Sequence, residues 1–452
     1  MNEILWNKIL AFDFDFPPSE YGFSTRLKME NKWTQAFAEK AILEYKKFMY
    51  LAAIAEGMVS PSEIIDVVWH QHLIFSKSYQ EFAELIGKQV QHLPSTHNRE
   101  ERERFKQAKE RTARLYTANF GTQPPDIWNC SEMFDSLRLP KAKFKIRSVI
   151  LMGIGLLVLL AIPFFYLLQP VYASIQNPYF LLGFGLTCIV CFFLLDFYNR
   201  KKLRQIIELA DKNSFLFDLS PNEVLYLRTQ NLKDVINGYM NELVKKEIIK
   251  INSDYTIELA DLNKTENSHQ LQITSLLSNL GRVYYPSLLQ QLLNKPLFSH
   301  ISGTMDAFRK YLIKSKKFGS LFSINLALIL ILILVGLTRV LTGLEAGRPV
   351  FLIILATFLV IAVGALFLNR LTNQASFHII PILYVEEILP SRNLSKESDW
   401  AYFIIGPSVL VSSFIPIVEY TNKNSSDGAG CGSSCGSSCG SSCGGCGGCG
   451  GD

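Results

Sequence analysis

The sequence predicts a mainly α-helical protein with membrane-spanning hairpins and helical cytosolic domains, and three observations predict this class. Hydrophobic residues make up 48% of the 452-residue chain. Four stretches of about 20 residues are almost entirely apolar, which is the length that crosses a bilayer as a helix. In much of the remaining chain, apolar residues recur at steps of three or four, the spacing of an amphipathic helix.

We expect residues 1–138 to form a helical domain that stays in the cytosol. The first 20 residues mix acidic and apolar side chains and do not resemble a signal peptide. One apolar helix face follows Trp33 and consists of Phe37, Ala41, Tyr45, Phe48 and Ala52. The next helix begins at SPSE, where Ser60 is the expected N-cap, Pro61 suits the first turn and Glu63 completes a capping box.

This second helix carries the motif DVVWHQH, which contains Asp66, Trp69, His70 and His72. His72 falls on the apolar stripe, which predicts a hydrogen-bonded core residue, whereas His70 shares the opposite face with Asp66. Histidines at i and i+2 cannot both reach one metal ion from a regular helix. A site would therefore need His92, which follows on a predicted loop. Two readings stay open: Asp66 and His70 form a structural surface pair, or they form a metal or catalytic site with His92.

Two transmembrane hairpins are predicted, at residues 148–197 and 318–368. Their turns contain only two charged residues, Glu345 and Arg348. Basic residues instead gather at the other ends of the spans: Lys141, Lys143, Lys145, Arg147, Arg200, Lys201, Lys202, Arg204, Arg309, Lys310, Lys314, Lys316 and Lys317. By the positive-inside rule, the N-terminal domain, the segment between the hairpins and the C-terminal tail lie in the cytoplasm.

We expect residues 198–317 to form a small cytosolic α+β domain. SPNE predicts a helix start with Ser220 as N-cap and Glu223 in a capping box. A second amphipathic helix and two short strands around Asn252–Asp254 follow, which is the order of a winged-helix unit. The charges on the second helix are balanced, which favours protein interaction and argues against nucleic-acid binding.

The C-terminal part is predicted in two pieces. Residues 369–426 form a juxtamembrane segment, in which the apolar run 401–418 is interrupted by Gly406, Pro407 and Pro416. We read this run as a membrane-surface or packed segment. The alternative is a fifth span, which would place the tail outside.

The low-complexity tail, residues 427–452, is expected to be disordered because glycine and serine separate its cysteines. The six candidate metal ligands of the tail are Cys431, Cys435, Cys439, Cys443, Cys446 and Cys449. Thiolates suit zinc, copper(I) or another thiophilic metal. Lipidation, redox chemistry and an unspecialised end are the alternatives, and a reduced cytosolic tail argues against a disulfide framework.

Residues 10–130 resemble the bacterial relatives of the plant glycine-rich domain proteins. The resemblance rests on FDFDFP, KWTQAFAEKAILEYKKFMYLA, SPSEIIDVVWHQHL, HLPS and TARLYTANFGTQPPDIW, in this order. The family's tryptophan-histidine motif matches Asp66, Trp69, His70 and His72, and its histidine-proline element matches His92 and Pro94. Residues 198–420 and the tail are similar to bacterial membrane proteins of unknown function that end in a glycine- and cysteine-rich segment. The resemblance implies no settled enzyme reaction.

We therefore expect a non-enzymatic protein of the bacterial inner membrane that contacts lipid and binds a cytosolic protein partner, with a tail that responds to metal or redox state. One alternative is a metal-assisted enzyme centred on Asp66, His70 and His92. Another is a small-solute transporter, which the scarcity of ionisable residues inside the spans disfavours.

Overall fold

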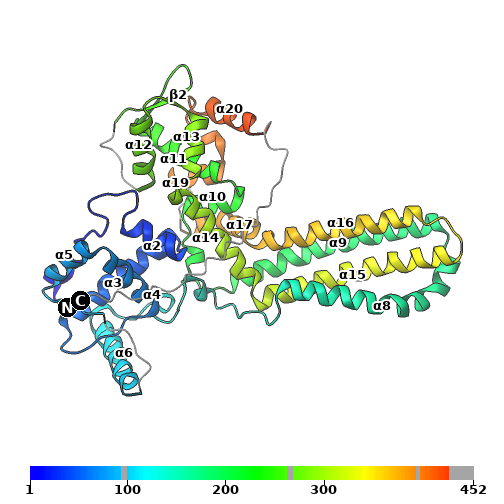
Figure 1. Ribbon diagram of the computed structural model, residues 1–452, viewed down its shortest axis with the longest axis horizontal. Helices are drawn as coiled ribbons and strands as arrows, with labels where there is room; N and C mark the ends of the chain where they lie inside the picture. The colour runs from blue at the N-terminus through cyan, green and yellow to red at the C-terminus, as the bar shows by residue number, and fades with distance from the viewer. Residues whose placement is uncertain (93–98, 262–267, 393–397, 427–452) are drawn as a thin grey trace, which may run out of the picture.

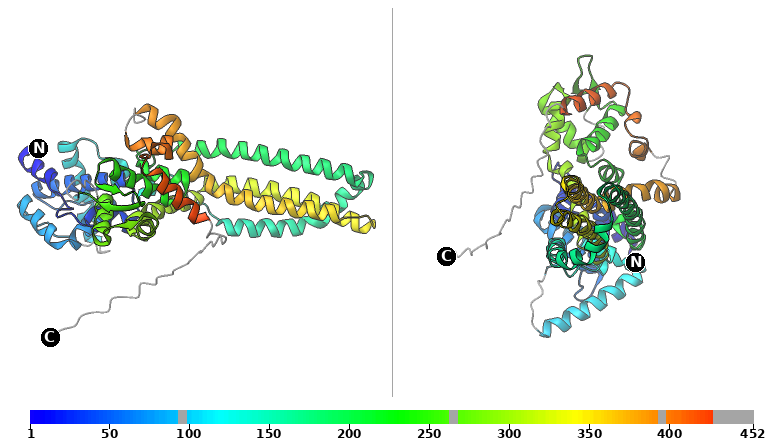
Figure 2. Two further views of the ribbon diagram at one scale, coloured as in Figure 1. Left: turned by 90° about the horizontal axis from the view of Figure 1, so that it is seen from above. Right: turned by 90° about the vertical axis from the view of Figure 1, so that its right-hand side faces the viewer.

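The computed structural model describes residues 1–92, 99–261, 268–392 and 398–426. Over these residues the chain is mainly helical with one small three-stranded antiparallel sheet, which confirms the prediction of a mainly α-helical protein. Four long helices extend in the same direction from a head that contains the other elements (Figure 1). The two turns that join these helices in pairs lie at the far end of the bundle (Figures 1 and 2).

The N-terminal domain packs around the predicted apolar helix. Its elements are α1 (Glu3–Ala11), α2 (Phe23–Asn31), α3 (Gln35–Ile54), α4 (Glu63–Ile74), α5 (Ser76–Ile86), α6 (Arg99–Phe120), α7 (Pro125–Trp128) and the 3-10 helix η1 (Met133–Leu137). Helix α3 contacts α1, α2, α4 and α6, and its predicted apolar face is fully buried. Trp128 packs back on the domain, because its indole N–H donates to the buried carboxylate of Glu44 at 2.8 Å.

The predicted N-cap of α4 is wrong by two residues. Ser62 caps the helix, and its hydroxyl accepts a hydrogen bond from the Ile65 N–H at 3.3 Å. The N–H of Ser60 instead donates to the Thr112 hydroxyl of α6 at 2.9 Å. The helix therefore begins two residues later than predicted, and the serine expected to cap it contacts α6 instead.

The four helices of the bundle are each long and apolar enough to cross a membrane, as predicted. They are α8 (Ile146–Ser174), α9 (Asn177–Glu208), α15 (Lys316–Glu345) and α16 (Phe351–Gln374). Helix α8 continues through Pro163 and Pro170 to Ser174, and only two residues separate it from α9.

Helix α15 is the central helix of the bundle. It packs most extensively against α8 and α16 and also contacts α9. Half of the residues in its most apolar 18-residue stretch are buried, whereas none of the residues in the corresponding stretch of α8 are buried. The two predicted hairpins are therefore joined into one bundle around α15, and much of the surface of α8 is left exposed.

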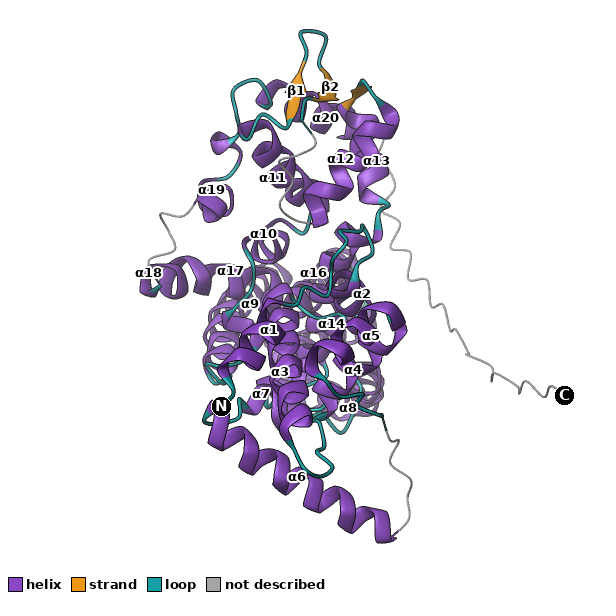
Figure 3. Ribbon diagram, turned by 90° about the vertical axis from the view of Figure 1, so that its left-hand side faces the viewer, coloured by secondary structure: helices purple, strands orange, loops and turns teal. Residues whose placement is uncertain are grey.

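The middle domain begins with the predicted order of two helices and two antiparallel strands. Its elements are the 3-10 helix η2 (Phe215–Phe217), α10 (Pro221–Thr229), α11 (Leu232–Lys245), β1 (Ile249–Ile251), β2 (Thr256–Leu259), α12 (Ser268–Leu280), β3 (Val283–Tyr284), α13 (Tyr285–Leu293) and α14 (Pro296–Ile313). The capping box of Ser220 and Glu223 is confirmed. The sheet has the order β1-β2-β3 at the outer end of this domain, with Ile249 opposite Leu259 and Ile257 opposite Val283 (Figure 3).

The segment after α16 continues into the head. It continues through η3 (Ala375–Ile379), α17 (Ile380–Leu383), η4 (Tyr384–Ile388) and α18 (Leu389–Ser391), of which η3 and η4 are π-helical. Next come α19 (Ser398–Ile405), the 3-10 helix η6 (Pro407–Val409) and α20 (Ile415–Ser426). Phe403, Leu410 and Phe414 of this run are buried, and Phe414 packs edge-on against Tyr285. The apolar run 401–418 is thus a packed segment.

The N-terminal and middle domains share one hydrophobic core. Phe134 of η1 stacks against Tyr311 and Phe308 of α14. The imidazole of His300, on the same helix, hydrogen-bonds the Trp33 carbonyl at 3.0 Å. Because these contacts tie η1 and the start of α3 to α14, the head forms a single packed unit at one end of the bundle.

Candidate functional site

His72 is a core residue, as predicted. It is fully buried, and its Nδ1 lies 2.9 Å from the Tyr45 hydroxyl while its Nε2 lies 3.3 Å from the Ser78 hydroxyl. The rings of Phe14, Phe23 and Phe82 surround it. Burial lowers the pKa of His72 to about 4, since an imidazolium ion would lose its hydration there. This histidine supports the fold of the N-terminal domain.

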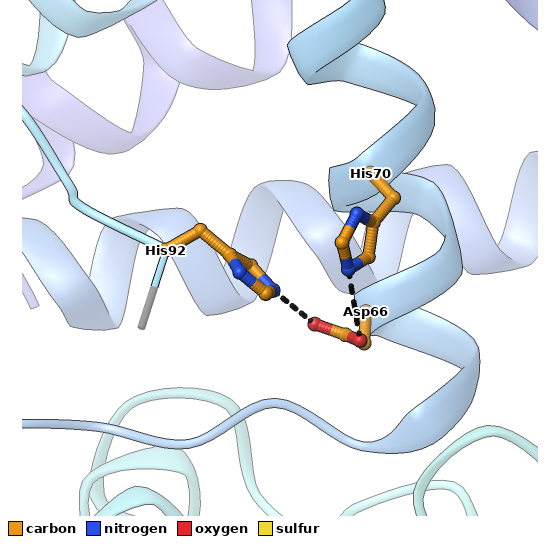
Figure 4. Close-up of side chains that lie close together, drawn as sticks. All are labelled: Asp66, His70 and His92. Carbon is orange, nitrogen blue, oxygen red and sulfur yellow. Dashed lines mark hydrogen bonds and ion pairs between the residues drawn. The ribbon is translucent and has the colours of Figure 1, made fainter. Parts of the chain in front are cut away.

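Asp66, His70 and His92 lie together on the surface of the same domain (Figure 4). The Nε2 atom of His92 is 2.8 Å from Oδ1 of Asp66, and the Nε2 atom of His70 is 3.4 Å from Oδ2. One carboxylate therefore lies between two imidazoles. The helix supplies Asp66 and His70 one turn apart, and the segment after α5 returns to supply His92.

Trp69 and Tyr79 explain how His92 reaches this position. The Trp69 indole N–H donates to the Tyr79 hydroxyl at 3.3 Å, and that hydroxyl donates to the Val90 carbonyl. The ring of Trp69 also lies edge-on to the His92 ring, with centroids 4.7 Å apart. Trp69 thus acts on the site through its contacts with the returning segment.

Lys88 holds the beginning of the same segment. Its ammonium group donates to the carbonyls of Ala52 and Ala55, at 2.8 and 3.0 Å, where α3 ends. A lysine in this place satisfies carbonyls that have no partner within the helix and interacts favourably with the negative end of the helix dipole. Two anchors, at Lys88 and Val90, therefore precede His92 along the chain.

A pocket of about 570 Å³ adjoins Asp66 and His92. Its apolar wall includes Phe48, Trp69 and Phe105, and Glu63 and Lys109 add charged groups. Glu63 and Asp66 are one helical turn apart and both line the pocket. A group bound in the pocket would therefore lie next to the carboxylate that joins the two histidines.

The three side chains offer two nitrogen ligands and one carboxylate ligand within 4.8 Å of one another. This set can bind a divalent metal ion, or Asp66 can orient the imidazoles for proton transfer without one. The structure brings Asp66, His70 and His92 together and places His72 apart from them, in the core. The six tail cysteines and Pro94 lie outside the described residues.

Sequence reasoning missed Tyr79 and Lys88 as positioning residues. Tyr79 lies seven positions after His72, on the next helix. Neither residue has a local signal for its role, because each acts on a backbone carbonyl of another segment.

Comparison of the chain with models of known protein families, with curated proteins and with solved structures finds no match. The assignment of a function therefore rests on the residues and on the geometry described above.

Proposed function

We propose that this protein is a membrane-anchored interaction protein, which holds a rigid helical head against the membrane surface for a protein partner. One observation carries this proposal: two bundle helices run into the head without a break. Helix α9 continues to Glu208, and the helical segment that begins with α16 continues to Ser391. The head therefore moves with the membrane helices and is not suspended on a flexible linker.

Charged contacts join these two extensions where they leave the bundle. Arg204 of α9 forms ion pairs with Glu208 on its own helix and with Glu386 and Glu387 of η4. Although exposed ion pairs each contribute little, one guanidinium between three carboxylates forms a network. The network supports a fixed orientation of the head relative to the bundle.

The basic flanks of the spans assign the head to the cytoplasmic side of the membrane. On the same reasoning the two short turns face the other side. The resemblance to bacterial glycine-rich domain proteins supports a bacterial inner membrane and a helical N-terminal domain. An interaction role needs no reaction at Asp66, His70 or His92, and it uses the pocket beside them as a binding surface.

Photo-crosslinking in native membranes tests this function. A photoreactive residue replaces Gln91, which lines the pocket, and in a matched variant replaces Leu159, an exposed residue on the lipid-facing helix α8. We expect one discrete protein adduct from position 91 and only lipid adducts from position 159. Further photoreactive variants at Lys109 and Glu63 extend the test around the pocket. If none of the pocket positions gives a discrete adduct, the interaction function is wrong.

A further inference from the structure

We propose that Asp66, His70 and His92 bind one divalent transition-metal ion of the zinc type. This site goes beyond the interaction function, which does not require a metal. The inference rests on three features: the spacing of the ligand atoms, the chemistry of the ligand set and the contacts that hold His92 in place.

The spacing of the ligand atoms suits a small metal ion. Zinc lies about 2.0–2.1 Å from imidazole nitrogen and about 2.0–2.2 Å from carboxylate oxygen, so two ligand atoms at tetrahedral angles are roughly 3.3 Å apart. The observed separations from the Asp66 carboxylate are 2.8 Å to His92 and 3.4 Å to His70. One ligand atom from each of the three side chains lies within 4.8 Å of the others, so side-chain rotations can bring both imidazoles and the carboxylate around a common centre.

The ligand set determines the class of ion. Two imidazoles and one carboxylate suit zinc and neighbouring divalent metals such as cobalt and nickel. Calcium and magnesium prefer oxygen ligands alone, and copper(I) prefers thiolates and thioethers. Both this site and the cysteine tail can bind zinc, but the tail would bind it through thiolates, so the two sites can be distinguished by spectroscopy.

The surrounding contacts hold the ligands in position before an ion arrives. Asp66 and His70 share one face of α4, so the helix sets their separation. The Val90 carbonyl is tied through Tyr79 to Trp69, and the Trp69 ring limits the orientation of His92. Fixed ligands lower the entropic cost of binding, as second-shell contacts do in metal sites generally.

The site is accessible to ions from solution and has an open side. The side chains of His70 and Asp66 are 57% and 38% exposed, so an ion need not cross a packed core to reach them. Three protein ligands leave one position of a tetrahedral zinc site open, as in catalytic zinc sites. Asp66 and His92 both line the adjoining pocket, so a carboxylate or phosphate oxygen of a bound molecule can take this position.

Cobalt(II) binding tests the site in the full chain. The protein is purified in detergent with all six tail cysteines replaced by serine, so that thiolates of the tail cannot bind the ion. We expect one cobalt ion per chain, with visible d–d bands of a nitrogen- and oxygen-ligated ion and without thiolate charge-transfer bands. Zinc should displace it and abolish the bands.

Single substitutions assign the ligands. We expect Asp66→Asn, His70→Ala and His92→Ala each to weaken cobalt binding at least about 10-fold. His378→Ala, at an exposed histidine far along the chain, is the matched control and should leave binding unchanged. Circular dichroism confirms that each variant is folded. Cobalt bands that persist in both histidine variants, or a folded parent protein that binds no stoichiometric cobalt, would overturn the proposal.

Discussion

At the residue scale, two histidines of one motif have different roles because they lie on opposite faces of α4. His72 is enclosed by aromatic rings and hydrogen-bonded by Tyr45 and Ser78, whereas His70 is mostly exposed beside Asp66. The local pattern of apolar residues is sufficient to separate these roles. It is not sufficient to place His92, which depends on the path of the chain after α5.

The buried imidazole of His72 should make the N-terminal domain less stable in acid. Its pKa is lowered to about 4, so the unfolded chain takes up this proton at higher pH than the folded chain does. Its contribution to stability is complete above its ordinary pKa and is lost as the pH falls from about 6.5 towards 4, by up to about 3 kcal/mol. The melting temperature of His72→Gln should fall less between pH 7 and pH 5 than the melting temperature of the parent protein does. His70→Gln, at the exposed histidine of the same helix, is the control variant.

Tyr79 should act on the proposed metal site as a positioning residue. Tyr79→Phe removes the hydroxyl that links Trp69 to the Val90 carbonyl and leaves the ring in place. We expect cobalt affinity to fall about 10-fold with little change in melting temperature. Tyr21→Phe, at an exposed tyrosine, should have no effect on cobalt binding. Equal affinities in the two variants would show that Tyr79 does not position His92.

At the scale of elements, Glu223 connects the starts of two helices from different domains. Its carboxylate accepts the Ser220 N–H of its own capping box at 2.7 Å and the Gln35 N–H of α3 at 3.1 Å. Burial raises the pKa of Glu223, and these N–H groups oppose the rise because they stabilise the charged form. The side chain thus supports α10 and docks the N-terminal domain on it.

Removal of this carboxylate should loosen the contact between the domains. Glu223→Ala leaves two helix N–H groups without their acceptor, at a cost of about 2 kcal/mol. We expect a lower melting temperature and faster proteolysis between residues 138 and 146. Glu81→Ala, at an exposed residue of α5, controls for the loss of a surface carboxylate. Unchanged proteolysis in Glu223→Ala would contradict the docking role.

A second contact between elements lies in the bundle, where Asn199 of α9 and Asn325 of α15 exchange two side-chain hydrogen bonds of 2.8 Å. Both are fully buried. A double-mutant cycle with Asn199→Ala and Asn325→Ala in detergent should give a coupling energy of about 1 kcal/mol. The cycle that pairs Asn325→Ala with Thr187→Ala, at an exposed threonine of α9, should be additive within about 0.5 kcal/mol. No coupling between the asparagines would mean that packing alone holds α9 against α15.

At the scale of the whole molecule, the head lies at one end of the bundle and both turns lie at the other (Figure 1). At the turn end the Arg339 guanidinium of α15 donates to the carbonyls of Tyr172 and Ile175, where α8 ends. This buried arginine satisfies carbonyls of a neighbouring helix. These hydrogen bonds explain why an arginine lies inside the bundle, and no ion path is needed to explain it.

The proposed orientation can be measured by cysteine labelling. Single cysteines replace Gln176 and Ala346 at the two turns and Lys212 in the head, in a chain otherwise free of cysteine. We expect a membrane-impermeant thiol reagent to label positions 176 and 346 in intact cells and to label position 212 only after lysis. Labelling of position 212 in intact cells would reverse the orientation.

The sequence by itself determined the properties that depend on local patterns. It predicted four apolar helices, the capping box of Ser220 and Glu223, the buried face of α3 and the core position of His72. Each follows from residues within a few turns of one another, where spacing decides which face is apolar and which groups cap a helix. The break in the apolar run at Gly406 was also visible, because Gly406 and Pro407 interrupt the pattern.

Only the tertiary structure decided the contacts between distant segments. In the structure Ser62, and not Ser60, caps α4, and α15 lies at the centre of the bundle. Glu223 also accepts a hydrogen bond from the start of a second helix, α3. The tertiary structure also brought His92 to Asp66 through Tyr79 and Val90. The physical reason is common to these cases: a hydrogen-bond partner supplied by a remote segment leaves no periodic trace in the sequence, because its position depends on how all the intervening elements pack.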